Sequence, residues 1–457
     1  MTTHYPAMLT IVPLECAPDV VLSVPGSKSI TNRALILAAL AEGVSTLQGV
    51  LAAEDTQVMI TALRALGFSV AVDSEAETVV VEGQGGRISA ASAEIFVGNS
   101  GTSVRFLTAL VALGQGPYRL DGVVRMRVRP LGDLLTALET LGVSAVSEAE
   151  TGCPPLVVSA QNGLHGGTVS LRAEASSQFL TALLMVAPYA QSDVRLEIVG
   201  SLRPFYIEIT RRMMAQWGIE TETEIQTAAE SGAYRSFIVR SGRKYTSQNS
   251  YTIEPDASSA SYFFAAAALT GGRVTVRGLT VDALQGDVRF ATEVLAQMGC
   301  SVTSASNGLT VVGPKPGTLR GIERDMSAIS DTAPTLAAIA PFATTPTTLH
   351  GLAHTRHQEC DRIAAVCTEL RKLGVHVEER ADGYTIYPLP NDLLPAEKMP
   401  SFKAIESKVA VETYNDHRIA MSFALIGLMR PGVTILNPGC VAKTFPDYWQ
   451  RLDLLRS

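Results

Sequence analysis

A helix end, a glycine and the start of a strand recur five times along the chain, and this repeat limits the folds that the sequence can adopt. Each glycine stands where a left-handed residue ends a helix, and an alternating strand pattern follows it. Successive copies lie 75, 76, 81 and 75 residues apart. A period near 76 in a chain of 457 residues predicts six structural units. The glycines are Gly67, Gly142, Gly218, Gly299 and Gly374.

Each unit contains a second helix, which is apolar on nearly every side beyond its first turn. A helix without a solvent face must be buried, so we expect six buried helices within an α/β fold. Their first residues lie 72, 77, 82, 73 and 84 residues apart, in step with the glycines. The predicted starts are Ser27, Asn99, Ser176, Ser258, Asp331 and Asn415.

The first turns of these helices are polar, and four of the six carry basic, amide or imidazole side chains. Small polar residues at a helix start are ordinary caps. The same free N–H groups, joined by an arginine, also form an anion site. If the units share a common symmetry the helix starts converge, and convergence favours the anion site. The side chains concerned are Lys28, Arg33, Arg105, Gln178, His417 and Arg418.

The length of the chain exceeds what one hydrophobic core supports, so we expect two domains with three units each. The polar, turn-rich stretch from Ser241 to Thr252 is the candidate crossing between them. No strand is followed by GxGxxG or GxxxxGK[ST], so no nucleotide cofactor is expected.

Charge and cysteine content exclude several classes of protein. A net charge of -7 argues against nucleic acid as the main partner. No basic leader with an apolar core and no apolar run of about 18 residues occurs, so we expect neither a secretory signal nor a membrane span. Six cysteines without a CxxC pair fit reduced thiols in the cytoplasm. His354 and His357 lack further ligands, so no metal site is expected.

Eight segments occur in one order from about residue 24 to about residue 448. They are VPGSKSITNRAL, GNSGTSVRFL, RMRVRPLGDLL, SSQFLTALLM, EPDASSASYF, QECDRI, YNDHRIAM and KTFPDYW. Together they resemble the motif series of the EPSP synthase family, the 3-phosphoshikimate 1-carboxyvinyltransferases. The resemblance implies a two-domain inverse α/β barrel of six βαβαββ units with buried helices. The outer domain would hold residues 1–25 and 254–457 and the inner domain residues 26–253, with two hinge crossings near 25 and 253.

The resemblance also implies a reaction. The enolpyruvyl group of phosphoenolpyruvate would pass to the 5-hydroxyl of shikimate 3-phosphate by addition and elimination, with release of phosphate. This step belongs to the shikimate pathway of aromatic amino-acid biosynthesis. It implies two small-molecule substrates, no cofactor, no nucleic acid and no membrane. A monomer is the expected state.

The family motifs map onto individual residues of this chain. Proton transfer would fall to Asp331 and Glu359, with Lys28 and Lys443 sharing it. The group that protonates C3 stays open, because a carboxylate among cations is a poor acid. Shikimate 3-phosphate would contact Lys28, Ser29, Arg33, Ser176, Ser177, Gln178, Ser201, Tyr206, Asp331 and Gln358. Phosphoenolpyruvate would contact Lys28, Asn99, Gly101, Arg125, Gln178, Arg362, Arg418 and Lys443.

The chain departs from the family pattern at a few positions. Gln358 stands where many members have lysine, and Arg356 or His357 is the candidate replacement cation. His354 stands where Asn is frequent, and the spacing from Ser201 to Tyr206 is altered. Phe106 stands where well-known members have proline, close to Gly101. The response to the family's inhibitor glyphosate is therefore left open.

Two other functions fit parts of the pattern. UDP-N-acetylglucosamine enolpyruvyl transferase shares the donor, but it carries a cysteine on a loop of the inner domain. The inner segment here holds Cys153 alone, without the residues that flank that loop. A non-catalytic binder of phosphorylated ligands would be expected to lose Asp331, Glu359, Lys28 and Lys443, which all remain. Release of phosphate on turnover separates an enzyme from a binder.

Overall fold

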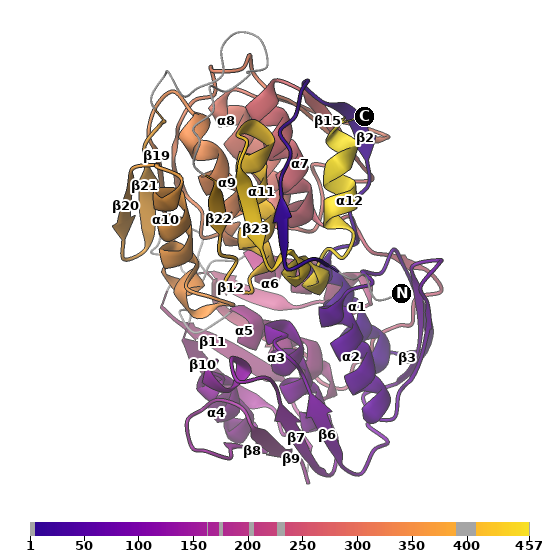
Figure 1. The fold of residues 1–457 in the computed structure, drawn as a ribbon. Coiled ribbons are helices and arrows are strands. Elements are labelled where there is room, and N and C mark those ends of the chain that lie inside the picture. Colours follow the sequence, from indigo (N-terminus) through magenta and orange to yellow (C-terminus); the bar gives the residue numbers. More distant parts are fainter. Residues whose placement is uncertain are drawn as a thin grey trace. The chain divides into compact units, whose positions relative to one another are not determined.

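The structure, a computed structural model, describes residues 5–161, 163–172, 177–200, 205–225, 234–389 and 408–456. The chain forms two compact units, and Figure 1 shows its elements coloured along the sequence. Unit 1 consists of Met1–Pro25 with Glu254–Ser457, and unit 2 consists of Gly26–Ile253.

Three four-stranded sheets form unit 2, and each combines one parallel strand pair with two antiparallel pairs. The first sheet has the order β14 (Tyr251–Thr252), β3 (Glu42–Gln48), β5 (Thr78–Gln84), β4 (Ser69–Asp73). The second has the order β6 (Ala93–Phe96), β7 (Pro117–Asp121), β9 (Leu156–Ser159), β8 (Ser144–Ser147). The third has the order β10 (Gly167–Arg172), β11 (Val194–Val199), β13 (Tyr234–Val239), β12 (Glu222–Ile225).

Unit 1 repeats this pairing pattern. One sheet has the order β16 (Ser301–Ala305), β17 (Gly308–Val312), β15 (Arg273–Arg277), β2 (Asp19–Leu22). Another has the order β18 (Glu323–Asp325), β19 (Thr347–His350), β21 (Gly383–Ile386), β20 (Val377–Arg380). The described strands of a third sheet are β1 (Met8–Thr10), β23 (Val433–Leu436) and β22 (Val409–Val411). In this third sheet the parallel pair is β22 with β23, and β1 runs antiparallel.

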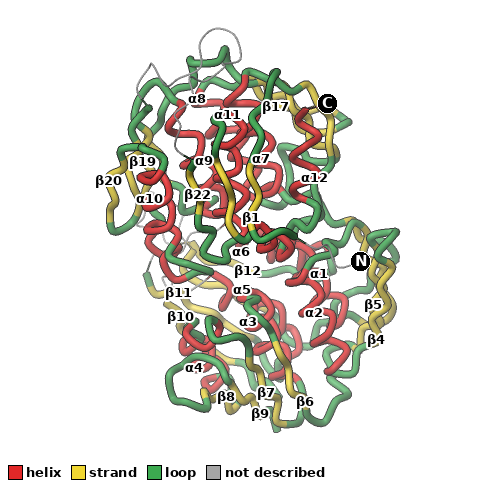
Figure 2. The backbone as a smooth tube through the Cα atoms, viewed as in Figure 1, coloured by secondary structure: helices red, strands yellow, loops and turns green. Residues whose placement is uncertain are grey.

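The six apolar helices are buried, as the sequence predicts. In unit 2 they are α1 (Lys28–Leu40), α3 (Gly101–Leu110) and α5 (Ser177–Val186). In unit 1 they are α7 (Ala257–Thr270), α9 (Ala333–Ile339) and α11 (His417–Met429). Every residue of α3, α7 and α11 is buried, so these helices form core on all sides. Figure 2 shows α7, α9 and α11 side by side in unit 1, where they pack against one another.

Five of these helices begin one or two residues after their predicted starts, and α7 begins one residue before its predicted start. The reason is capping: Ser27, Ser100, Asp256 and Asp416 lie just outside their helices and accept backbone N–H bonds. Asp331, the predicted start of the fifth helix, lies two residues before α9. Residues Ser330–Thr332 form a separate 3-10 turn, and the Asp331 side chain bonds to arginines.

The other helices end as predicted, because all five repeat glycines have a positive φ, between 81° and 111°. These helices are α2 (Glu54–Ala65), α4 (Gly132–Thr140), α6 (Phe205–Gln216), α8 (Ala296–Met298, after a π-helical turn over Phe290–Leu295) and α10 (Arg362–Lys372). Helix α12 (Tyr448–Asp453) lies near the end of the chain. Within the described residues, no helix is both long and apolar enough to cross a membrane.

Candidate active site

In unit 2, the start of α1 presents a lysine beside a buried carboxylate. Ser27 Oγ accepts the N–H of Ile30, and this cap places Lys28 as the first residue of the helix. Lys28 Nζ lies 3.5 Å from Asp55 Oδ2, and the Asp55 side chain is 5% exposed. The ion pair therefore fixes the lysine at the helix start.

Arg33 lies one turn further along α1 and is buried. Its guanidinium donates to Ser29 O at 2.8 Å, to Thr210 Oγ1 at 2.8 Å and to Tyr206 O at 3.3 Å. The guanidinium carbon lies 5.4 Å from the centre of the Phe106 ring. Burial lowers the pKa of Arg33 to about 10, which keeps it charged at neutral pH. Arg33 thus links α1 to α6, and Phe106 packs beneath it.

Two arginines converge on the start of α3. Arg105 Nη1 donates to Gly101 O at 2.8 Å, and Arg129 Nη1 donates to Asn99 O at 3.1 Å. A Cβ at Gly101 would lie 2.2 Å from Arg129 Nη2 and 2.7 Å from Arg105 Nη1. Burial, and then the charge of Arg129, lowers the pKa of Arg105 to about 9. Both cations are buried, and their guanidinium groups meet beside Gly101, so the local positive charge suits an incoming anion.

Gln178, the second residue of α5, extends this cluster. Its Oε1 accepts from Arg105 Nη1 at 2.9 Å, and its Nε2 donates to Thr102 Oγ1 at 3.4 Å. Ser177 and Tyr206 are half-buried at the starts of α5 and α6. Ser176 and Ser201 lie outside the described residues.

The basic segment before α4 divides into one buried and two exposed arginines. Arg125 and Arg127 are exposed, and Arg127 pairs with Asp121 at 2.7 Å. Arg129 is buried against the start of α3. Sequence reasoning predicts Arg125 as the ligand and leaves Arg129 as a neighbour. Nothing in the RMRVR pattern marks which arginine turns inward.

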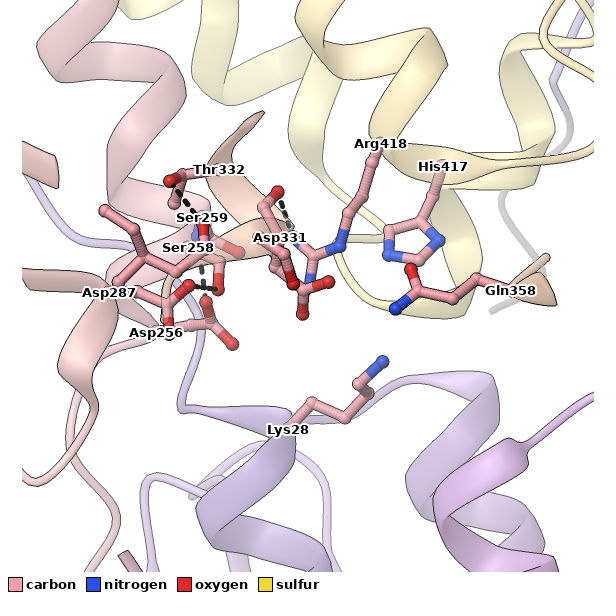
Figure 3. A network of polar contacts seen from close by, with 12 residues as sticks. Lys28, Asp256, Ser258, Ser259, Asp287, Asp331, Thr332, Gln358, His417 and Arg418 are labelled. Atoms are coloured by element: carbon pink, nitrogen blue, oxygen red, sulfur yellow. Dashed lines mark hydrogen bonds and ion pairs between the residues drawn. The ribbon is translucent and has the colours of Figure 1, made fainter. Parts of the chain in front are cut away.

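In unit 1, the Asp331 carboxylate lies between two arginines, and Figure 3 shows Arg418 reaching it. Asp331 Oδ1 accepts from Arg362 Nη1 at 3.1 Å, and Oδ2 accepts from Arg418 Nη2 at 2.6 Å. Arg362 also binds Asp416 through Nε at 2.8 Å. Burial opposes the charge of both arginines, but these carboxylates hold the pKa of each above its ordinary value. Both therefore remain cations inside the protein.

Glu359 lies between a histidine and a lysine. Its Oε2 is 2.9 Å from His417 Nδ1, and its Oε1 is 2.9 Å from Lys443 Nζ. Burial alone would raise the pKa of Glu359, but His417 and Lys443 hold it well below its ordinary value. Burial lowers the pKa of His417, so its neutral ring donates from Nδ1. Glu359 is therefore ionised at neutral pH and holds no proton to donate.

The residues that depart from the family pattern have identifiable contacts. Gln358 Oε1 accepts from Arg362 Nη1, and His354 Nε2 bonds to Ser330 Oγ at 3.0 Å. Arg356 binds the carboxylates of Asp361 and Glu379 and two backbone carbonyls. The suggestion that Arg356 replaces the missing cation is therefore not supported by its position.

Sequence reasoning misses a further carboxyl group, Asp287, in the 3-10 turn Gly286–Val288. Its Oδ1 accepts from Ser258 Oγ at 3.1 Å, and Figure 3 shows the pair beside Asp256 at the start of α7. Burial, with the charge of Asp331, raises the pKa of Asp287 to about 7. Nothing in the sequence around Asp287 marks it as a titrating group.

Three possible ligand groups, on Glu359, Asp416 and His417, lie within 4.8 Å of one another. The two carboxylates already bind Lys443 and Arg362. These ammonium and guanidinium groups occupy the acceptors that a metal ion would need, so we assign no metal to this cluster.

Each unit of this α/β protein carries buried cations at helix starts, with carboxylates beside some of them. This arrangement is typical of a protein that binds small polyanions. A family model described as EPSP synthase (3-phosphoshikimate 1-carboxyvinyltransferase) matches residues 19–452. The chain belongs to the EPSP synthase family.

Individual relatives agree with this membership. A 3-phosphoshikimate 1-carboxyvinyltransferase of Nostoc punctiforme is 49% identical over 434 residues, which cover 95% of each chain. A chloroplastic one of Arabidopsis thaliana is 45% identical over 94% of this chain and 81% of that protein. The solved EPSP synthase structure from Acinetobacter baumannii matches with a TM-score of 0.79 and 26% identity, over 97% of each chain. The mixed α/β fold is that of these structures.

Proposed function

We propose that the chain transfers the enolpyruvyl group of phosphoenolpyruvate to the 5-hydroxyl of shikimate 3-phosphate and releases phosphate. Membership of the family supports this reaction. The observation that supports it most is the Asp331 carboxylate, which binds both Arg362 and Arg418. The reaction needs a base that removes a proton beside an anionic donor, and it needs cations that bind this donor.

The fold supports a two-domain inverse α/β barrel of six βαβαββ units. Each of the six sheets combines one parallel pair with antiparallel pairing, and a buried helix belongs to each unit. We propose hinge crossings near 25 and 253, which is where unit 1 meets unit 2 along the chain. Closure about two such crossings would follow binding of the acceptor to the inner domain.

The proposed donor contacts include several cations. Arg362, Arg418 and Lys443 in unit 1 are all charged and lie at or next to an end of their helices. In unit 2 the start of α3 and the nearby Arg125 offer the second set. Planar guanidinium groups bind carboxylate and phosphate through two bonds, which fixes the donor's orientation. Lys28, Asn99, Gly101 and Gln178 complete the proposed donor contacts.

The acceptor would lie against the helix starts of unit 2. The proposed contacts there are Lys28, Ser29, Arg33, Ser176, Ser177, Gln178, Ser201 and Tyr206. Asp331 and Gln358 are further proposed acceptor contacts. Each of the three guanidinium nitrogens of Arg33 already donates one hydrogen bond to the protein, so we expect its contribution to phosphate binding to be mainly electrostatic.

Proton transfer divides between two carboxylates. Asp331 would take the proton of the 5-hydroxyl once the donor anion draws Arg362 and Arg418 toward itself, since losing these donors makes the carboxylate a stronger base. Addition to C2 needs a proton at C3, and elimination of phosphate returns one from C3. Glu359 is too strongly held as an anion to donate, so Lys443 or Lys28 is the source, and Glu359 is the acceptor on elimination.

We further propose a monomer in the cytoplasm that needs no cofactor. Free thiols at all six cysteines are compatible with a reducing compartment. Cys153, the cysteine of unit 2, is buried, so it offers no exposed thiol to the alternative chemistry on a UDP-sugar.

The test is phosphate release from phosphoenolpyruvate with shikimate 3-phosphate or UDP-N-acetylglucosamine as acceptor. The proposal predicts release with shikimate 3-phosphate alone. Release with neither acceptor, while shikimate 3-phosphate still raises the melting temperature, would identify a binder and refute the reaction.

A further inference from the structure

Three cations of unit 1 come from three different elements. Arg362 is the first residue of α10, Arg418 is the second residue of α11, and Lys443 is the last residue of the 3-10 helix Pro438–Lys443. A single anion can use all three only if these elements keep one relative position.

The loop that leads into α11 has an unfavourable backbone conformation. Tyr414 and Asn415 have φ values of 54° and 55°, in the left-handed region. Asparagine tolerates this region, but an aromatic residue seldom adopts it. Such a conformation persists only where the surrounding structure stabilises it. Here it directly precedes Asp416, the cap of α11, and His417, the first residue of that helix.

Helix α10 holds the loop from one side. Glu369 is fully buried, and its Oε1 accepts from Tyr414 Oη at 2.7 Å. Its Oε2 accepts the backbone N–H of Glu412 at 3.1 Å, and Lys372 binds both oxygens. Glu369 lies seven residues after Arg362, about 10 Å along the helix, so it acts at a distance from the site.

The segment that carries Lys443 holds the loop from the other side. Asn437 Nδ2 donates to Asn415 Oδ1 at 3.1 Å. Asn437 itself has a φ of 47° and immediately precedes the 3-10 helix that ends at Lys443. The two contacts thus tie the loop to both elements that carry the other cations.

We propose that these contacts form a brace that positions Arg362, Arg418 and Lys443 for the anionic donor, an inference that rests on the proposed function. The brace consists of Glu369, Tyr414, Asn415 and Asn437. These four are positioning residues. The side chains of Glu369, Tyr414 and Asn437 bind the loop, one another and Lys372, so they act on the three cations through the loop.

The test compares Tyr414→Phe with Tyr387→Phe. Both remove a hydroxyl that donates to a glutamate of unit 1, but Tyr387 bonds to Glu378 on the sheet of β20 and β21. Steady-state kinetics are measured for each substrate, with thermal unfolding as the check on folding. We expect Tyr414→Phe to raise KM for phosphoenolpyruvate roughly tenfold, the usual scale for losing a bond to a charged group. KM for shikimate 3-phosphate should change less than about twofold, and Tyr387→Phe should leave both unchanged.

A second variant tests the contact between the loop and the segment that carries Lys443. Asn437→Ala removes the bond to Asn415, and we expect the same selective rise in KM for the donor. Asn415→Asp keeps the oxygen that accepts from Asn437 Nδ2 and should retain a near-normal KM for the donor.

Unchanged donor KM in both Tyr414→Phe and Asn437→Ala would overturn the brace. Equal rises in KM for both substrates, or a fall in kcat alone, would overturn it as well. Failure of the proposed function is separate, because it appears in the unmodified protein as no phosphate release with either acceptor.

Discussion

Arg418 Nη2 lies 2.6 Å from Asp331 Oδ2, and the two residues are 87 positions apart in the chain. Arg362 Nη1 reaches the other oxygen of the same carboxylate at 3.1 Å. Helix starts from different repeats of unit 1 therefore meet on one acidic group. A carboxylate so placed is ionised, oriented and next to the cations that would bind an anionic substrate.

Asp331→Asn keeps the shape of this group and removes its ability to accept a proton. We expect kcat to fall by about 10² to 10⁴, the range for loss of a general base, with smaller changes in both KM values. Stopped-time assays of phosphate release measure this. Asp282→Asn, an exposed residue of the same unit, is the matched control and should retain full kcat. An Asp331→Asn enzyme with wild-type kcat would remove Asp331 from proton transfer.

Gly101→Ala would place a methyl group 2.2 Å from Arg129 Nη2 and 2.7 Å from Arg105 Nη1. Both guanidinium groups must then shift, and small displacements of binding groups are costly. We expect KM for phosphoenolpyruvate to rise at least about tenfold while the protein stays folded. Gly132→Ala is the control, because its nearest neighbour would be 4.0 Å away. Equal donor KM in the two variants would show that the start of α3 does not bind the donor.

Arg125 and Arg127 differ by two positions, and both are exposed. Arg125→Ala should raise KM for phosphoenolpyruvate by roughly tenfold to a hundredfold, as expected for a lost charge-assisted contact, without lowering the melting temperature. Arg127→Ala breaks only the exposed pair with Asp121 and should leave the kinetics unchanged. The reverse ranking would exchange the roles of the two arginines.

Asp287 makes stability depend on pH. Its pKa in the folded protein is about 7, chiefly through burial, whereas an aspartate in an unfolded chain titrates near pH 4. Its stabilising contribution is therefore complete below about pH 4 and is lost as the pH rises through about 7. Asp287→Asn stays neutral and escapes this loss.

The melting temperature of Asp287→Asn should accordingly exceed that of the wild type by an amount that grows from pH 5 to pH 7 and is constant above pH 8. Asp282→Asn should give the same difference at every pH. A flat difference for Asp287→Asn as well would mean that Asp287 is ionised throughout the range.

The repeat explains why much of the fold could be predicted. Gly67 and its four equivalents end helices because of a local backbone conformation that glycine favours. The apolar helices are predicted to be buried from their composition alone. Helix starts were predicted less well, because a serine or aspartate can stand inside or outside the first turn. Ser258 lies in α7, while Asp256 is the cap.

The site was predictable where a residue type carries the chemistry, as with the arginine that leads α10 or the one in the first turn of α11. The site was not predictable where the packing of the folded chain determines which side chain is buried and what surrounds it. Arg129 turns inward and Arg125 outward within one basic run, and Asp287 titrates because of what surrounds it. Arg356 is occupied by Asp361 and Glu379, partners that only the folded chain brings together.

Transfer of the enolpyruvyl group can be followed atom by atom with carbon-13 NMR. Phosphoenolpyruvate labelled at C2 is mixed with shikimate 3-phosphate and the wild-type protein. We expect the label to move to the enol-ether carbon of a product substituted at the 5-hydroxyl, with one phosphate released for each transfer. A label that stays in phosphoenolpyruvate, or that appears as pyruvate with phosphate and unchanged shikimate 3-phosphate, would contradict it.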